Sequence, residues 1–278
     1  VALFPIYIKQ HSLFNVVRIW QHSHCYDSTP LICKGIDFNT IYNALLLHYS
    51  SHILQINLHQ ETLFSHTSVS VHNKYKRAYI YNTSTLNDHI LTGKDKRELN
   101  RLKRKLNDHY NVNYFEHSDP EKGLNDYCQI EDNSWKHQSG GTINSSSFSK
   151  QYYLNLATHS KKSNKLTFSC LTANDQVIAI AMRIKSGSHF FEIKTSYHQD
   201  FKQFAPGRIL EHHILDSLSK ENTITVDSCT HHENKLINRI WPNQKTFLRS
   251  HVFSTDFYSR AIKLMYIAKV RLQKFRYQ

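Results

Sequence analysis

The residues best able to do chemistry lie between Gly187 and Trp241. An apolar, aromatic run at 189–197 is followed by a polar loop, and Ala205-Pro206-Gly207-Arg208 then opens an amphipathic run. A second, β-branched run ends on Asp227. This order predicts a strand, a phosphate-type turn, a helix and another strand. The first amides of a helix are unpaired and lie at the positive end of its dipole, so we expect an anion at this turn.

The tripeptide Pro206-Gly207-Arg208 is the centre of this hypothesis. Glycine lets the backbone approach a phosphate closely, and the arginine supplies a forked cation. By itself the tripeptide is more typical of an ordinary turn before a helix. The order of the surrounding strands is what favours a binding turn.

The same stretch resembles the acetyltransferases of the GNAT superfamily, and within it the CelD-like, FemAB-related branch of cellulose and exopolysaccharide biosynthesis. The resemblance rests on the aromatic strand, the P-G-R-I-L helix start, the D-S-C strand and the later run NKLINRIWPNQK, and it covers about Lys94 to Lys245. Two departures occur, because Ala205 stands where the family usually has Ser and Phe204 where it often has Tyr.

The resemblance implies acetyl-CoA or another acyl-CoA as co-substrate and an amine as acceptor, such as an amino sugar or a polysaccharide precursor. The pantetheine arm would pair like an added strand with the main chain of Lys194, Thr195 and Ser196. The residues expected around the diphosphate are Phe204, Pro206, Gly207, Arg208 and Ile209.

Transfer by direct attack needs a group that takes a proton from the acceptor. Asp227 is the first candidate, although a cap on the following helix is an equal alternative. His231 and Glu233 in the next loop are further candidates, with solvated loop residues as their alternative, and Tyr197 could protonate the departing thiolate. Glu192 and Lys194 could pair with each other without any chemical role.

Two other functions stay open. FemAB-like relatives imply an aminoacyl-tRNA donor, which the basic helix expected at 94–107 and the basic C-terminal segment would hold through its phosphates. A basic adaptor that docks on an anionic membrane or polymer through residues 255–276 is the non-enzymatic alternative.

Charge favours an anionic partner. The chain has a formal net charge of +13, and residues 244–278 hold eight Lys or Arg against Asp256 alone. Such a segment suits a lipid headgroup, RNA or an acidic polysaccharide, or else forms a solvated helix face. We therefore expect a cytoplasmic protein that can lie peripherally on the inner membrane face, and its oligomeric state is left open.

The remaining motifs exclude several classes. No Walker loop, G-x-G-x-x-G, H-E-x-x-H or serine-triad motif occurs, which removes support for NTPase, dinucleotide, zincin and hydrolase functions. The five cysteines form no C-x-x-C pair, and the histidines lack the spacing of a structural zinc site, so we expect reduced thiols and no metal.

The expected fold is mixed α+β, with tandem GNAT-like units that each have a mostly antiparallel twisted sheet flanked by helices. We expect an N-terminal half-domain at 1–91, whose natural start lies upstream, a catalytic domain at 92–250 and a basic helix at 251–278. In the catalytic domain, Leu99, Leu102 and Leu106 should be buried on a helix, a helix beginning at Asp119-Pro120 should run through Trp135, and residues 165–197 should form a three-stranded meander.

Overall fold

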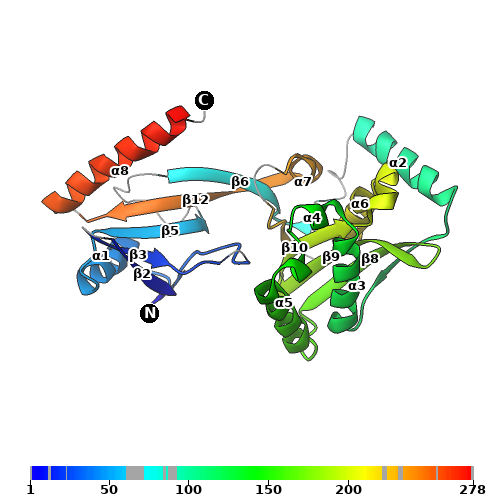
Figure 1. Ribbon diagram of the computed structural model, residues 1–278, viewed down its shortest axis with the longest axis horizontal. Helices are drawn as coiled ribbons and strands as arrows, with labels where there is room; N and C mark the ends of the chain where they lie inside the picture. The colour runs from blue at the N-terminus through cyan, green and yellow to red at the C-terminus, as the bar shows by residue number, and fades with distance from the viewer. Residues whose placement is uncertain are drawn as a thin grey trace. The chain divides into compact units, whose positions relative to one another are not determined.

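The computed structural model describes residues 2–11, 14–22, 24–60, 72–83, 86, 93–220, 224–230, 234–254 and 256–276. The chain forms two compact units, one from residues 1–76 and 245–278 and one from residues 77–244 (Figure 1). The boundaries between the two units therefore follow residues 76 and 244, whereas the domain boundaries expected from the sequence follow residues 91 and 250.

The first unit has a mostly antiparallel sheet. Strands β2 (Ile6–Gln10) and β3 (Asn15–Ile19) are antiparallel, β3 runs parallel to β5 (Ile53–Gln60), and β5 is antiparallel to β12 (Asn243–Phe253). A small second sheet joins β1 (Ala2–Leu3) to β4 (Leu31–Ile32). The helices are α1 (Phe38–His48) and α8 (Phe257–Arg276).

The buried apolar side chains of the first unit form two clusters, because successive residues of its strands point to opposite faces of the sheet. Val17 and Leu54 pack with α1, whereas their neighbours Val16 and Ile53 pack with Ile262 of α8. Successive side chains of a strand point to opposite faces, so one helix covers each face of the sheet.

The second unit carries the site. Its helices are α2 (Gly93–Asn107), α3 (Pro120–Asp132), the short α4 (Trp135–Gln138), α5 (Ser147–Ser160), α6 (Pro206–Ser219) and α7 (Lys235–Ile240), with 3-10 turns η3 (Ile143–Ser145) and η4 (Gln199–Phe204). Its strands, in spatial order, are the end of β6 (His72–Ile80), β11 (Thr225–Asp227), β10 (His189–Tyr197), β9 (Gln176–Ser186), β8 (Leu166–Ala173) and β7 (Val112–Glu116).

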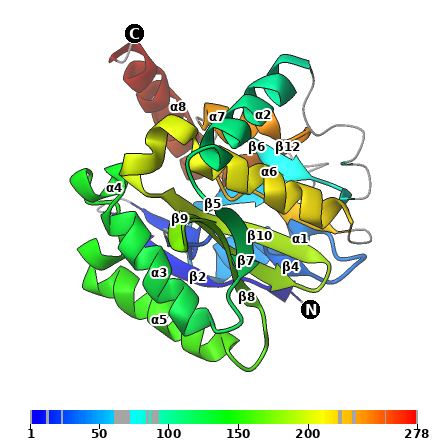
Figure 2. The same ribbon diagram turned by 90° about the vertical axis from the view of Figure 1, so that its right-hand side faces the viewer.

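Helices cover both faces of this sheet (Figure 2). On one face, α6 and the leucines of α2 enclose the largest apolar cluster with β8–β11. On the other, α3 lies so close to β8 that a Cβ added at Gly123 would be 2.4 Å from the Phe168 ring. The predicted mixed α+β fold with mostly antiparallel sheets flanked by helices is thus confirmed, as are the buried leucine stripe and the three-stranded meander.

Two helix limits differ from prediction. The helix beginning at Pro120 ends at Asp132 rather than continuing through Trp135, because the Asn133 side chain bonds back to the carbonyl of Gln129 and Ser134 caps α4. The last helix begins at Phe257 rather than at residue 251, because β12 continues to Phe253 and Asp256 accepts a hydrogen bond from the amide of Ser259.

The pairing of β10 creates an open edge. β10 is antiparallel to β9 along its length but parallel to β11 over only three pairs, which end at Phe191 opposite Asp227. In the described part of the chain, residues 192–197 have no strand partner on the β11 side. A register shift between Glu192 and Lys194 marks a β-bulge, which reverses the faces of the residues that follow.

Candidate functional site

The predicted turn lies at the start of α6. Ala205 caps the helix in the left-handed conformation, at φ 49° and ψ 54°, and it contributes no side-chain cap. Its carbonyl accepts the amides of Arg208 and Ile209 at 3.0 and 3.2 Å. Pro206 has no N–H, and the amide of Gly207 has no partner among the described residues. One backbone donor at the positive end of the helix is therefore available.

Space is also available at this turn. A Cβ added at Gly207 would meet only the ring of Tyr197, at 3.5 Å. The structure thus brings together two residues that the sequence nominated, one from the end of β10 and one from the first turn of α6.

Arg208 faces α2. Its Nη2 donates to the carbonyl of Asp95 at 3.3 Å and lies 3.6 Å from the Asp95 carboxylate, while its buried Nε has no partner in the described residues. A pocket of about 1030 Å³ opens beside it along α2. Six cations and two acids line this pocket, together with two asparagines: Lys94, Arg97, Arg101, Lys103, Arg104, Arg208, Asp95, Glu98, Asn100 and Asn107. The surplus of cations makes this basic groove suited to a phosphorylated ligand.

The open part of β10 is reached by a lysine from α4. Lys136 Nζ donates to the carbonyl oxygen of Thr195 at 2.6 Å, and it lies 3.6 Å from Glu131. Burial lowers the pKa of Lys136 to about 8. This group was not nominated from the sequence.

Lys194 is held inside the unit, not beside Glu192. Its Nζ lies 2.9 Å from Glu131 and over the rings of Tyr127 and Tyr153. Glu131 is fully buried and also accepts from the hydroxyl of Tyr127. The suggestion that Glu192 and Lys194 pair is therefore wrong, because the β-bulge directs them to opposite faces of the sheet.

Glu192 instead meets Glu211 of α6. Both carboxyl groups are buried and in hydrogen-bonding contact, and the indole of Trp241 donates to Glu211 at 2.6 Å. Burial, and then the charge of Glu211, raises the pKa of Glu192 well above its ordinary value. Two carboxylates in contact cannot both be ionised, so Glu192 carries the shared proton.

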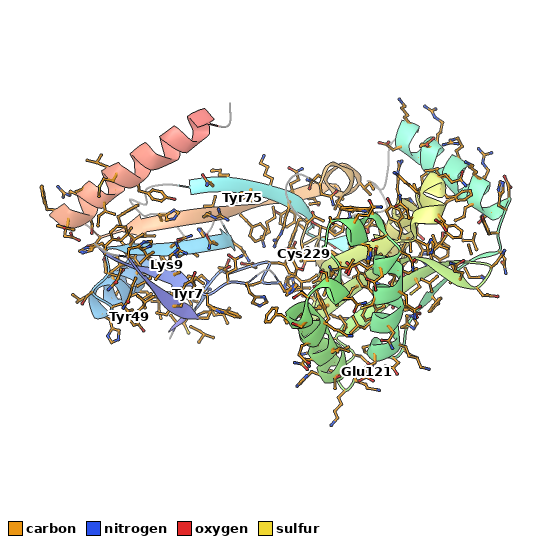
Figure 3. The ribbon with its side chains drawn as sticks, in the orientation of Figure 1. Tyr7, Lys9, Tyr49, Tyr75, Glu121 and Cys229 are labelled. Carbon is orange, nitrogen blue, oxygen red and sulfur yellow. The ribbon has the colours of Figure 1, made fainter. Side chains whose placement is uncertain are left out.

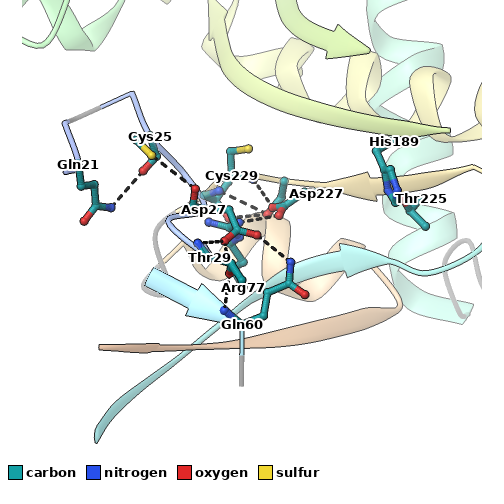
Figure 4. A network of polar contacts seen from close by, with 12 residues as sticks. Gln21, Cys25, Asp27, Thr29, Gln60, Arg77, His189, Thr225, Asp227 and Cys229 are labelled. Carbon is teal, nitrogen blue, oxygen red and sulfur yellow. Dashed lines mark hydrogen bonds and ion pairs between the residues drawn. The ribbon is translucent and has the colours of Figure 1, made fainter. Parts of the chain in front are cut away.

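Asp227 is engaged by its neighbours. Arg77 Nη2 donates to its Oδ2 at 2.5 Å, and the amide of Cys229 donates to its Oδ1 at 2.9 Å (Figure 4). Cys229, which is labelled in Figure 3, follows β11. Its φ is positive, at 51°, so the aspartate also supports this turn. The carboxylate proposed as a base is thus part of a buried ion pair.

The other nominated residues are placed as follows. Phe204 and Ile209 are core residues, exposed by 2% and 0%, so neither side chain can reach a ligand. Thr195 is exposed, and Ser196 is buried with its hydroxyl unpartnered among the described residues. His231 and Glu233 lie outside the described residues.

The described residues contain no group of three or more His, Cys, Asp or Glu placed to hold a metal ion. Among the described helices, none has the length and apolar character needed to cross a bilayer.

Comparison with solved structures shows similarity over nearly the whole chain. The C-terminal domain of a putative lysylphosphatidylglycerol synthetase from Agrobacterium fabrum has a TM-score of 0.59 at 11% identity, covering 95% of this chain and 86% of the other. L-PGS from Bacillus licheniformis has a TM-score of 0.57 at 11% identity, covering 95% of this chain and 84% of the other. FemX has a TM-score of 0.53 at 9% identity, covering 93% of this chain and 86% of the other. At these identities the likeness is one of fold.

No curated protein sequence matches the chain. Residues 93–234, just over half of the chain, match the family model described as the acetyltransferase (GNAT) domain. This range includes α2, the open strand β10, the turn at Gly207 and β11. The chain therefore belongs to the GNAT acetyltransferase domain family, and it is an acyltransferase.

Proposed function

We propose that the second unit transfers an acyl group from an acyl-CoA to an amine by direct attack. The observation that carries this proposal is the early end of the β10–β11 pairing at Phe191, which leaves the rest of β10 open next to the first turn of α6. An extended amide-containing arm can pair with an open strand edge, and a diphosphate can bind at a helix start.

The residues fit the phosphate end of such a donor. The amide of Gly207 has no partner among the described residues, and the next residue, Arg208, lines the basic groove with its forked side chain. The donor supplies the acyl group as a thioester. The chain supplies binding through these donors and through the main chain of β10, and Tyr197 beside the turn remains our candidate for protonating the thiolate.

Calorimetry with two donors tests this assignment. Acetyl-pantetheine lacks the nucleotide and its phosphates, whereas acetyl-CoA has both. Arg208→Gln should weaken acetyl-CoA binding about tenfold or more, because a charge-assisted hydrogen bond contributes roughly 1.5–3 kcal/mol, and should leave acetyl-pantetheine unaffected. Lys162→Gln, at an exposed lysine after α5, is the matched control. Equal loss for both donors would place Arg208 outside the phosphate site.

A second donor class is supported by the length of the groove. Lys94, Arg97, Arg101 and Arg104 recur at three- and four-residue intervals and so share one face of α2 over about 15 Å. Such a stripe exceeds the needs of one diphosphate and favours RNA, as in an aminoacyl-tRNA donor. Unfractionated tRNA should then bind with a steep salt dependence, which Arg97→Gln and Arg104→Gln should reduce. If aminoacyl-tRNA is the donor, coenzyme A should not compete with tRNA for the groove.

The acceptor and the surroundings of the enzyme are also part of the proposal. The resemblance to the CelD-like branch supports an amino sugar or a polysaccharide precursor as the acceptor.

On α8, Phe257, Leu264 and Met265 are 86%, 70% and 57% exposed and lie beside Arg260 and Lys263. This combination supports peripheral docking on an anionic, cytoplasmic membrane surface. Co-sedimentation with phosphatidylglycerol vesicles, with and without Leu264→Glu, tests it.

A further inference from the structure

Lys136 occupies an unusual position for a lysine. It lies in the short helix α4 and reaches the main chain of β10 at Thr195, four residues beyond the last pair with β11. Its side chain is 21% exposed, so it is mostly buried but still accessible to a ligand. No side chain of the described residues separates its Nζ from the Thr195 carbonyl, 2.6 Å away.

The charges around Lys136 do not balance one to one. The Glu131 carboxylate accepts from the hydroxyl of Tyr127 and the amide of Ile143, and it pairs at 2.9 Å with Lys194. Lys136 is more distant from the same carboxylate, at 3.6 Å. Two ammonium groups therefore share one carboxylate, and the second positive charge is incompletely compensated.

This environment makes the neutral amine of Lys136 more accessible than that of an ordinary lysine. Burial is the main cause that brings its pKa to about 8, and the charge of Lys194 acts in the same direction, while Glu131 opposes both. A lysine tuned to this range has both protonation states available near neutral pH, as a general base requires. Once protonated, it has Glu131 and the Thr195 carbonyl as acceptors.

We propose that Lys136 is the proton acceptor for the attacking amine, a role that rests on the proposed transfer function. The neutral Nζ takes one proton from the acceptor ammonium, and the freed nitrogen pair forms the C–N bond to the acyl carbon. The C–S bond breaks and its electron pair leaves on sulfur. The Tyr197 hydroxyl gives its proton to that thiolate and takes up the second proton of the attacking nitrogen, and Lys136 returns its proton to solvent.

Neighbouring groups are less suited to this task. Lys194 is paired with Glu131 at 2.9 Å, and its Nζ lies over two tyrosine rings, so it is already engaged by its neighbours. Asp227 is paired with Arg77, and Glu192 shares its proton with Glu211. Lys136 thus combines access, proximity to the open edge and an incompletely compensated charge.

The first test needs no turnover. In the full chain labelled with 13C at lysine Cε, the Lys136 signal, assigned by its absence from Lys136→Arg, should titrate near pH 8. Titration at the ordinary lysine value of 10.5 would overturn the proposal whatever the donor or acceptor.

The second test follows thiol release from acetyl-CoA with glucosamine as probe acceptor. The wild-type kcat/KM should rise with pH through about 8, and Lys136→Arg should lose that rise together with about 100-fold or more in rate. Lys136→Ala should lose as much and regain activity with added trimethylamine, which accepts a proton but forms no stable amide. Lys162→Ala, at an exposed lysine, should behave as wild type.

The outcomes separate the two proposals. If the wild type turns over and Lys136→Arg has the same rate and pH profile, the role of Lys136 is overturned and the transferase assignment stays intact. Loss of acetyl-CoA binding in Lys136→Ala, measured by calorimetry, would show that Lys136 only supports β10. Absence of both donor binding and thiol release in the wild type would remove the transferase proposal itself.

Discussion

Glu192 on β10 and Glu211 on α6 share one proton in the interior of the second unit. Because the folded-state pKa of Glu192 is raised, the folded chain retains a proton that the unfolded chain has lost above its ordinary glutamate pKa. The free energy of unfolding therefore falls as pH increases above that range.

Glu192→Gln should weaken this dependence, since an amide can donate to Glu211 at any pH. We expect its melting temperature to exceed that of the wild type at pH 8 and to approach it near pH 5. Asp108→Asn, at an exposed acid, should leave the profile unchanged. Parallel melting curves for Glu192→Gln and the wild type from pH 5 to 8 would contradict a shared proton.

The ion pair of Arg77 and Asp227 should be structural. Both side chains are 6% exposed, and removal of one partner leaves a buried charge uncompensated. Asp227→Asn should lower the free energy of unfolding by roughly 3 kcal/mol. Urea unfolding measures this, and the double change Arg77→Met with Asp227→Leu should recover most of the loss. A stable Asp227→Asn variant without transferase activity would instead favour Asp227 as the base.

Gly123 should be irreplaceable for packing. Its missing side chain lets α3 approach the Phe168 ring, and an added Cβ would lie 2.4 Å from that ring. Gly123→Ala should destabilise the protein by about 1–3 kcal/mol through overpacking. Phe168→Leu in the same chain should relieve part of this loss, which thermal unfolding can detect. Additive losses in the double variant would show that the two residues do not compete for space.

Lys136 should also influence stability with pH. Its folded-state pKa of about 8 is below the ordinary 10.5, so between these values the unfolded chain binds more protons and stability rises with pH. The full effect is roughly 3 kcal/mol. Lys136→Met should remove this rise, and unfolding in urea at pH 7.5, 9 and 10.5 would show it. A rise that persists in the variant belongs to another group.

The sequence predicted those features that depend on local pattern. The leucine stripe of α2, the turns of the β8–β10 meander and the helix start after Pro206 follow from periodicity and turn residues within a few positions. The same signals could not end α3 at Asp132, because that limit depends on the side-chain hydrogen bonds of Asn133 and Ser134.

The polar partners of the site were not predictable from local pattern. Lys136 meets a carbonyl 59 residues away, and Arg77 meets a carboxylate 150 residues away. Alternation along β10 would place Glu192 and Lys194 on one face, and only the bulge between them reverses this. Such contacts depend on which strands become neighbours, and the residue types alone carry no signal of it.

The central claim is that the first turn of α6 binds the donor diphosphate through the Gly207 amide. Gly207→Asp and Gly207→Ala both add a Cβ where only Tyr197 is near, and an acid in the first turn of a helix is favourable for stability. The aspartate, however, would repel a diphosphate.

Calorimetric titration of acetyl-CoA into the wild type, Gly207→Ala and Gly207→Asp is the most direct test. We predict that the wild type and the alanine variant bind within about threefold of each other and that the aspartate variant binds about 100-fold more weakly, a difference of roughly 2.7 kcal/mol. Equal binding by the aspartate variant, or no binding by the wild type, would contradict the account.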